Sequence, residues 1–442
     1  MTLAIAPGRT FILGHLPEFR RDPIAFIQKY RAAYGTLVHI QLFRRDVYLV
    51  SEPELIHEVL VTQAKNFKKS RALQLARDLL GNGLLTAEGD THLKHRRMIA
   101  PAFHRKKIFD YARLMGQEGA KFRGALHAGE QIDLHAAMME LTLAIVARTL
   151  FDADVTGDAK NVGEALHAAL SMFQRVTNPF AQILRKIPTP GTLKFNRARK
   201  QLFGIIDRII EEHRGHDHGD LLSMLLEARD EEDASAMSHE QIRHEALTLF
   251  LAGHETTANA LTWAFYLLAK NPDKAALMRK EVRTQTSSLS MDQPIPPEQA
   301  QNFPYCKNVF AEALRLYPPA WIVGREALAD FNLAGHSIPA GSVILMSQFV
   351  VHRDAKWFTD PLAFQPERWE SESDRPKFAY FPFGGGPRTC IGDQFAWMEG
   401  TLLLAEISRQ FSFEPLTDAI PQPQITLRPR GGMLTTVVAS QL

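Results

Sequence analysis

The sequence predicts a mainly α-helical protein with small β-sheets, folded as a single large domain over residues 1–442. Long amphipathic segments with helical periodicity fill the middle of the chain, and short stretches with strand-like alternation flank them. No Ser/Gly linker, low-complexity tract or internal repeat marks a domain boundary. Because 45% of the residues are apolar and 23% are charged, the chain can bury a large core.

Charge and cysteine content limit the classes of function. With 51 basic and 49 acidic side chains the net charge is +2, which gives no global attraction to nucleic acid or to an anionic membrane, although local basic patches remain open. The first residues, MTLAIAPGRTFILGHLPEF, are too broken by Pro, Gly and Arg for a secretion signal or a spanning helix. Two cysteines cannot form a disulfide framework. We therefore expect a soluble, cytoplasmic chain without a membrane anchor.

Strand signals come early and late. Residues 37–42 and 46–50 predict a hairpin with a charged turn, and residues 335–346 predict a turn followed by a strand. Between them, residues 220–233 predict an amphipathic helix that ends in a charge run, which we interpret as a solvated face and loop.

The clearest predicted helix runs from Ser238 to Lys270. SHEQ at its start is a capping box with Gln241 three residues after Ser238, and Asn271 and Pro272 end the helix. At 1.5 Å per residue such a helix is about 48 Å long, enough to cross the domain.

This helix has a polar centre. In LFLAGHETTANALTW, Gly253, His254, Glu255, Thr256 and Thr257 interrupt an apolar run. Glycine at such a place costs about 1 kcal/mol relative to alanine, and a glutamate in a core is rare unless it is paired. One interpretation is a bend, in which the Thr256 hydroxyl bonds to the carbonyl four residues earlier. The other is a notch that holds a small ligand and passes protons to it, and both can hold together.

Cys390 lies in FPFGGGPRTCIG, a stretch too rich in Gly and Pro for a helix or a central strand. A protease nucleophile would need a nearby His signature, a zinc site would need more Cys or His ligands, and the run lacks a phosphate-loop lysine and a G-x-G-x-x-G pattern. A metal that takes one thiolate, such as haem iron, remains. Arg388 can pair with a haem carboxylate, and a helix after Gly392 would aim its positive end at the thiolate. Cys306 instead fits a small buried apolar residue on a helix.

These residues carry a resemblance to a known family. Phe383, Gly386, Arg388, Cys390 and Gly392 match the haem-binding pattern F-x-x-G-x-R-x-C-x-G of the cytochrome P450 family at every fixed position. Four further stretches are similar to its motifs in the same order: GDTHLKHRRMIAPAF, AGHETT, EALR and FQPERW. The resemblance covers nearly the whole chain and implies the P450 fold. There is one departure, because many relatives have Trp where His92 stands.

The resemblance implies a role for each matching residue. Cys390 is the expected axial ligand of the iron of haem b, and dioxygen is the expected co-substrate. Thr256 is expected to hydrogen-bond the iron-bound oxygen and Glu255 to feed protons to it, with Gly253 providing space beside Ala252. The residues expected to bind the cofactor are Cys390, Arg388, His92, Arg96, Phe383, Gly386, Gly392, Ala252, Gly253 and Arg325. Those expected to act structurally, as a buried ion-pair network that supports the Cys390 loop, are Glu312, Arg315 and Arg368.

Several polar clusters have plainer interpretations. His92 and His95 are three residues apart, but a propionate contact or a solvated helix face is preferred over a metal pair. The cluster His213, His216 and His218 is interpreted as a flexible polar loop. A basic face is predicted near the haem helix, where it serves an acidic redox partner or is simply solvated surface; it comprises Lys94, Arg96, Arg97, Arg105, Lys106 and Lys107.

The resemblance implies a monooxygenase that acts, as a monomer, on a hydrophobic molecule of fatty acid, terpenoid, steroid or polyketide type. Electrons are expected from a separate ferredoxin or flavodoxin with an NAD(P)H-dependent reductase. Residues 73–85 and a mobile lid at 177–191 are expected beside the substrate, and the lining residues are Ala252, Ala320, Trp321, Ile322, Val323, Met433 and Leu434. A peroxide-using enzyme or isomerase is the second hypothesis and a haem-binding sensor the third.

Overall fold

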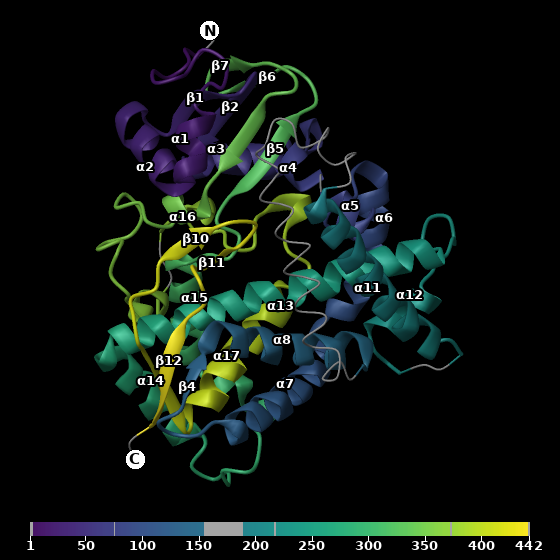
Figure 1. Cartoon of the computed structure of the whole chain (residues 1–442), viewed down its shortest axis with the longest axis vertical. Helices are drawn as coiled ribbons and strands as arrows, with labels where there is room; N and C mark the ends of the chain where they lie inside the picture. The colour runs from purple at the N-terminus through teal and green to yellow at the C-terminus, as the bar shows by residue number, and fades with distance from the viewer. Residues whose placement is uncertain (1–2, 75, 154–188, 216–217, 372–373, 441–442) are drawn as a thin grey trace.

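The structure is a computed structural model, and it describes residues 3–74, 76–153, 189–215, 218–371 and 374–440. Helices make up the larger part of the molecule, and most strands lie in a smaller part that also holds the N-terminus (Figure 1). The predicted fold class, mainly α with small sheets, is confirmed. The described α-helices are α1 (Leu16–Arg21), α2 (Pro23–Tyr34), α3 (Pro53–His57), α4 (Arg71–Gln74), α5 (Arg77–Leu80), α6 (Gly89–Ile99), α7 (Arg105–Ala125), α8 (Leu134–Phe151), α11 (Pro190–Glu212), α12 (Leu221–Glu227), α13 (His239–Lys270), α14 (Pro272–Gln285), α15 (Pro304–Leu316), α16 (Gln348–Val351) and α17 (Asp393–Ser408).

Helix α13 runs through the middle of the helical part (Figure 1). The predicted capping box is present, because the Ser238 hydroxyl accepts from the Gln241 N–H at 3.2 Å and the Gln241 side chain accepts from the Ser238 N–H at 2.7 Å. The helix ends at Lys270, before Asn271 and Pro272, as predicted. It packs against α8, α15 and α17, so it is the axis around which the helical core is built.

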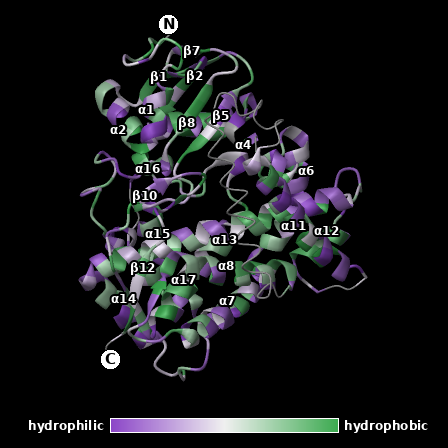
Figure 2. Cartoon of the chain, in the orientation of Figure 1, coloured by the Kyte–Doolittle hydropathy of each residue, from purple (hydrophilic) through white to green (hydrophobic). Residues whose placement is uncertain are grey.

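The largest sheet has the strand order β1-β2-β8-β5-β3. The predicted early hairpin is confirmed as β1 (Leu37–Leu42) and β2 (Arg45–Val50), with Leu37 opposite Val50. The predicted turn and strand at 335–346 is observed as β7 (His336–Ile338) and β8 (Val343–Met346), and β8 runs parallel to β2. Strand β8 is coloured as hydrophobic in Figure 2, in keeping with its central position. The remaining strands are β3 (Phe67–Lys69), β4 (Gln131–Asp133), β5 (Val323–Ala327), β6 (Phe331–Leu333), β9 (Phe411–Pro415), β10 (Pro421–Pro423), β11 (Leu427–Pro429) and β12 (Leu434–Ala439).

Apolar side chains gather in one large helical core and two smaller cores against the sheet. Helix α8 is apolar enough over 134–151 to span a membrane by length and composition, but it packs against α13 and α7 and supplies buried side chains to the main core. It is therefore the core helix of a folded domain.

The predicted helix at 220–233 is shorter in the structure, and its charge run is not simply solvated. Helix α12 ends at Glu227, and Asp230 is buried and receives a 3.0 Å hydrogen bond from Arg97. A buried carboxylate requires such a partner, which explains why the run folds onto α6. The expected lid at 177–191 lies almost entirely outside the described residues.

Candidate active site

The Cys390 loop is shaped by its glycines. Gly386 has a φ of +69°, and a Cβ added there would lie 1.9 Å from the Leu60 carbonyl oxygen. A Cβ on Gly385 would lie 2.3 Å from the Phe378 ring. The Cys390 N–H donates to the Phe383 carbonyl at 3.0 Å, which closes the loop. Only glycine fits these two positions, so the loop is a backbone cradle that presents Cys390.

Cys390 is exposed as a residue, while the loop surrounds its sulfur atom closely enough to desolvate it. This enclosure raises the pKa of the thiol to about 11, whereas the Gly392 N–H that points at the sulfur and the Arg96 guanidinium lower it. Helix α17 begins directly after Gly392, so its positive end faces the loop. Without a cofactor the site therefore favours the neutral thiol, and a bound metal cation would supply the charge that holds the sulfur as a thiolate.

Basic side chains that are buried or partly buried converge beside this loop. Burial and the neighbouring arginine Arg388 lower the pKa of His92 to about 3 and that of Arg325 to about 10, and they lower the pKa of Lys69 well below its usual range. Arg388 forms an ion pair with Glu88 and donates to the Ala87 carbonyl at 2.6 Å. This set of donors has an excess of positive charge in a poorly solvated place, so it requires an anionic group.

A haem fits this requirement. Arg96 donates to the Thr389 carbonyl at 2.8 Å, next to Cys390, so the cations and the thiol belong to one site. The carboxylates of a haem would neutralise the cations, while the sulfur would bind its iron. Lys69, from strand β3, is the member of this set that the sequence did not suggest.

The polar centre of α13 contains two back-bonded threonines. The Thr256 hydroxyl donates to the Ala252 carbonyl at 2.7 Å, as the bend interpretation predicts, and the Thr257 hydroxyl donates to Gly253 at 3.4 Å. Such bonds compete with the helix ladder and weaken the turn. Ala252 is exposed and Glu255 is buried, so the turn has one open side and one side directed into the protein.

Glu255 is the first member of a buried polar chain. The Thr426 hydroxyl donates to its Oε1 atom at 2.5 Å, and the Asn259 amide donates to Thr426 at 3.3 Å. The Oδ1 atom of the Asn259 side chain lies 3.0 Å from Nε2 of His135 on α8. Burial raises the pKa of Glu255, and the Thr426 hydrogen bond and Arg428 act in the opposite direction. The chain connects a carboxyl group in the helix notch to a partly exposed histidine, and through these hydrogen bonds it fixes the orientation of Glu255.

The predicted ion-pair network is buried. Glu312 accepts from Arg315 at 2.7 and 2.8 Å, from Arg368 at 2.9 Å and from the Trp369 indole at 2.9 Å. Both Glu312 and Arg315 have no exposed surface. Every carboxylate oxygen therefore has at least two donors, which compensates the burial of the charge.

This network reaches the Cys390 loop through His352, a residue that sequence reasoning missed. Arg315 donates to the His352 carbonyl at 2.8 Å, and Nε2 of His352 accepts from the Phe381 N–H at 2.9 Å. Burial and the nearby Arg315 hold the pKa of His352 well below its usual range, so its ring is neutral. A neutral imidazole can accept at Nε2, and it joins α15 to the start of the loop.

Three expected site residues, Gly253, Met433 and Leu434, have surroundings in the structure that the sequence did not indicate. A Cβ on Gly253 would lie 3.0 Å from Val146, so this glycine allows the close contact between α13 and α8. Met433 is buried in the main core, where its N–H donates to Asp133 at 2.9 Å, and Leu434 is 57% exposed on β12. The C-terminal residue that contacts the α13 notch is Thr426.

The other expected lining residues differ in their surroundings. Trp321 packs in the small core next to the sheet and donates to the Gln424 carbonyl at 2.8 Å. Ile322 packs against the same core and Val323 begins β5, and both are partly exposed. Trp321 is thus a core residue, and Ile322 and Val323 remain candidates for a lining.

The histidine clusters are also corrected. His92 and His95 are buried, which excludes a solvated helix face, and Nδ1 of His95 lies 2.6 Å from Glu245. His213 is not in a flexible loop, because it is buried next to the end of α11 and its Nε2 lies 2.8 Å from Asp220. His216 lies outside the described residues. Among the described residues, no group of three or more His, Cys, Asp or Glu side chains could together hold a metal ion.

The expected basic face is largely paired within the chain. Lys94 donates to Asp233 at 2.6 Å, and Arg97 lies 3.0 Å from both Asp230 and Glu232. These contacts remove Lys94 and Arg97 from a surface that an acidic partner could use. Arg105 and Lys106 are exposed at the start of α7 and keep that potential.

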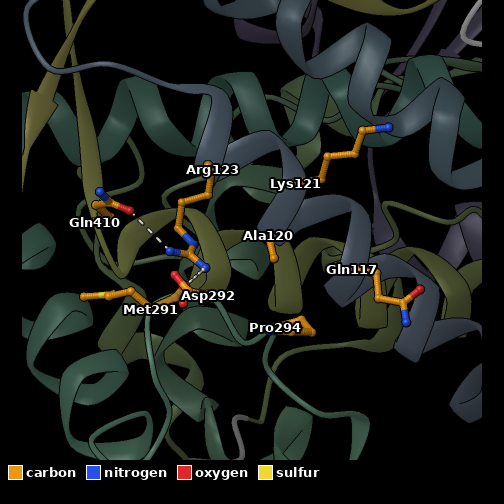
Figure 3. Close-up of a pocket in the computed structure, with 9 residues that line it drawn as sticks. Gln117, Ala120, Lys121, Arg123, Met291, Asp292, Pro294 and Gln410 are labelled. Carbon is orange, nitrogen blue, oxygen red and sulfur yellow. Dashed lines mark hydrogen bonds between the residues drawn. The ribbon is translucent and has the colours of Figure 1, made fainter.

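A shallow cavity of about 520 Å³ lies elsewhere, at the end of α7 (Figure 3). Its Arg123 donates to Gln410 at 3.2 Å and to the buried Glu406 at 2.9 Å. Arg123 therefore ties α7 to α17 and is not free to bind a ligand. We assign this cavity no part in the site.

Comparison with known proteins agrees with the geometry. Residues 6–436 match the family described as "Cytochrome P450". The chain is 36% identical over 434 residues to "Cyclooctatin synthase" of Streptomyces melanosporofaciens, covering 96% of this chain and 93% of that protein. It is 34% identical to "Cyclooctat-9-en-7-ol 5-monooxygenase" of the same organism, with 94% and 90% covered, and 34% identical to "Pentalenene oxygenase" of Streptomyces avermitilis, with 94% and 93% covered.

A mainly helical fold, a glycine cradle around one accessible cysteine and a neighbouring cation cluster define a haem-thiolate protein. The chain belongs to the cytochrome P450 family. It is a monooxygenase, which inserts one atom of dioxygen into a hydrophobic organic substrate with electrons from a redox partner.

Proposed function

We propose that this enzyme binds haem b through Cys390 and hydroxylates a hydrophobic substrate of terpenoid type. The proposal rests on one observation. Arg96, a member of the basic cluster, donates to the carbonyl of Thr389 at 2.8 Å, and Thr389 is the residue next to Cys390, so the cluster and the exposed thiol lie together. Haem, when bound, supplies activation of dioxygen, and the thiolate donates electron density that favours cleavage of the O–O bond. We further propose that residues 1–442 form one domain.

The cofactor would be held by side chains on both sides of the loop. His92, Arg96, Arg325 and Arg388 would pair with its carboxylates, together with Lys69. Gly386 and Gly392 allow the backbone to turn around the sulfur, and Phe383 packs against Trp397 with ring centroids 5.7 Å apart. The structural group Glu312, Arg315 and Arg368 holds the segment before the loop through His352.

The residues of α13 would manage protons. Thr256 is the proposed donor of a hydrogen bond to the oxygen that is being reduced, and its hydroxyl can rotate away from the Ala252 carbonyl to do so. Glu255 would hold the proton that resupplies Thr256. Thr426, held in turn by Asn259 and His135, would orient the Glu255 carboxyl group for this transfer. The raised pKa of Glu255 suits this exchange, because a proton donor works best when its pKa approaches the working pH.

The substrate proposal rests on the relatives. Two of them are named for action on pentalenene and on cyclooctat-9-en-7-ol, which are a hydrocarbon and a hydrocarbon alcohol. Among the four classes that the sequence suggests, terpenoids fit these names. Ala252, Ile322 and Val323 would form part of an apolar lining, in which one or two polar groups orient the substrate.

We propose that the electrons come from a ferredoxin or flavodoxin, which an NAD(P)H-dependent reductase reduces. The exposed Arg105 and Lys106 support an acidic partner at the start of α7, although the pairing of Lys94 and Arg97 makes this face smaller than the sequence suggests. We propose that the enzyme is a cytoplasmic monomer.

Substrate binding tests the proposal directly. The haem-loaded enzyme should show a low-spin to high-spin shift with pentalenene or cyclooctat-9-en-7-ol, and no comparable shift with a fatty acid of similar size. With an added ferredoxin and reductase it should form a hydroxylated product only when NAD(P)H is present. Product formed without an electron donor would favour the peroxide-using enzyme or isomerase.

A variant tests the role of Thr256. Thr256→Ala should consume NAD(P)H but release hydrogen peroxide in place of product, whereas Thr256→Ser should restore part of the coupling. Thr257→Ala is the matched control, because the Thr257 hydroxyl bonds back to Gly253 and lies on the neighbouring face. Full coupling in Thr256→Ala would remove Thr256 from this role.

A further inference from the structure

Three consecutive apolar side chains protrude from the N-terminal end of the molecule. Phe11 is fully exposed, Ile12 is 63% exposed and Leu13 is 37% exposed. We call Phe11, Ile12 and Leu13 the apolar tip. Single exposed apolar residues are common on soluble proteins, but a contiguous group that contains an aromatic ring marks a binding surface.

The tip is held in a fixed turn. The Thr10 N–H donates to the Gly14 carbonyl at 2.8 Å, and the Gly14 N–H donates back at 3.1 Å. The Phe43 N–H donates to the Leu13 carbonyl at 2.9 Å, which fastens the tip to the turn between β1 and β2. A Cβ on Gly14 would lie 2.2 Å from the Gln41 carbonyl oxygen, so the turn sits directly against β1. The three side chains are therefore exposed on a well-defined turn that is hydrogen-bonded to the rest of the fold.

Arginines surround the tip. Arg9 precedes the turn, Arg44 follows Phe43, and Arg20 and Arg21 end α1, whose first N–H bonds to the Leu13 carbonyl at 3.1 Å. All four arginines are exposed, and none has an ion-pair partner within the described part of the chain.

The acidic groups nearby are already engaged. Glu18 lies 2.6 Å from Lys29, Asp22 accepts from the Ala25 N–H at 3.0 Å, and Asp46 lies 3.1 Å from His39. The surface around the tip therefore has a local excess of positive charge, although the chain as a whole is nearly neutral.

We propose that this end of the molecule docks on a lipid bilayer that contains anionic lipids. Phe11, Ile12 and Leu13 would insert at the boundary between headgroups and acyl chains, and the four arginines would contact lipid phosphates. A rigid apolar point with a basic rim matches the two layers of such an interface, apolar inside and anionic outside. The attachment is peripheral and reversible, and it needs no spanning helix.

Vesicle flotation of the haem-loaded enzyme tests this inference. With vesicles of equal parts phosphatidylcholine and phosphatidylglycerol, the wild type is expected to float with the lipid. The double variant Phe11→Ser/Ile12→Ser is expected to bind about tenfold less. Arg9→Glu/Arg44→Glu is expected to lose binding to these vesicles, and added salt is expected to weaken the binding of the wild type.

The matched control is Leu362→Ser/Ile420→Ser, which removes two apolar side chains that are 74% and 52% exposed elsewhere. This control is expected to bind vesicles like the wild type. Circular dichroism and the haem absorption of all variants should be unchanged, because every substituted side chain is exposed. Vesicle binding does not depend on turnover, so the inference stands or falls independently of the proposed function.

Two results would overturn the inference. The first is that the wild type does not float with anionic vesicles, or that the Phe11→Ser/Ile12→Ser variant binds them as strongly as the wild type does. The second is equal binding to pure phosphatidylcholine, which would leave the arginines without a role. A change in oligomeric state or redox-partner affinity in the tip variant, without vesicle binding by the wild type, would assign the tip to a protein instead.

Discussion

The Nδ1 atom of His95 lies 2.6 Å from the Oε1 atom of Glu245, and neither side chain is appreciably exposed. The second oxygen of Glu245 accepts from the Leu84 N–H at 2.8 Å. One carboxylate thus connects α6, α13 and the segment that leads into α6. Lys69 holds the same segment, because its ammonium group donates to the Leu84 and Leu85 carbonyls.

Glu245→Ala is expected to lower the free energy of unfolding by about 3 to 5 kcal/mol, because it removes the carboxylate that contacts the buried His95 and leaves the Leu84 amide without its acceptor. Urea denaturation of the haem-loaded protein measures this. Glu240→Ala, five residues earlier on the same helix and 75% exposed, is the control and should change stability by less than about 1 kcal/mol. Similar small losses of unfolding free energy in both variants would show that the contacts of Glu245 with His95 and Leu84 do not stabilise the fold.

Arg315→Lys is expected to cost about 3 to 5 kcal/mol and to reduce haem content. Lysine cannot reproduce the two bonds to Glu312 together with the bonds to the His352 and Pro361 carbonyls, at 2.8 and 2.7 Å. Haem per chain and denaturant unfolding measure the two effects. Lys356→Ala, which breaks the exposed pair with Glu52, should cost at most about 1 kcal/mol and keep the haem. An Arg315→Lys enzyme with a full haem content would show that this network does not support the Cys390 loop.

Glu399 gives a pH-dependent prediction. It is fully buried on α17, and neither oxygen accepts a well-formed hydrogen bond from a described residue, although the Thr257 hydroxyl approaches it. Burial raises its pKa from 4.5 to about 8. Between these values the folded state holds a proton that the unfolded state has lost, so the stabilisation is complete below pH 4.5 and is lost as the pH rises to 8.

Glu399→Gln should remove this dependence. Relative to the wild type, its free energy of unfolding should rise by about 1 kcal/mol per pH unit across that window. Urea denaturation at several pH values measures the difference. Glu414→Gln, an exposed change on the neighbouring β9, should run parallel to the wild type. A Glu399→Gln curve parallel to the wild type would show that this carboxyl group is ionised in the folded enzyme.

Thr426→Val should raise the pKa of Glu255 further, because it removes the hydroxyl that donates to the ionised carboxylate at 2.5 Å. Infrared titration of the protonated carboxyl band measures this, with Glu255→Gln used to assign the band. Thr426→Ser keeps the donor and should titrate like the wild type. An unchanged titration in Thr426→Val would show that the Thr426 hydroxyl does not influence the protonation of Glu255.

The sequence predicted elements whose signals are local. The capping box and the Asn-Pro stop predicted the two ends of α13. The glycines at 384–386 predicted a loop in place of a helix or strand, and the structure has room for no side chain at Gly385 and Gly386. The weakened turn at Thr256 also followed from one side chain and a carbonyl four residues away.

Contacts between distant segments were not predictable in this way. Thr426 meets Glu255 across 171 residues, and its position between two three-residue strands leaves no periodic pattern. The sequence instead suggested Met433 and Leu434, a few residues further along the same end of the chain, for the lining. The basic face was overestimated for the same reason, because Asp230 and Asp233 reach Arg97 and Lys94 only through the tertiary fold.

The most direct test of the account is the absorption spectrum of the reduced, carbon-monoxide-treated protein. The wild type should show the red-shifted Soret band of a thiolate-bound haem, and Cys306→Ala, which changes the other cysteine, should show it too. Cys390→His should lose this band while still binding haem. A red-shifted band that persists in Cys390→His, or that is missing from the haem-loaded wild type, would contradict the assignment of Cys390 as the iron ligand.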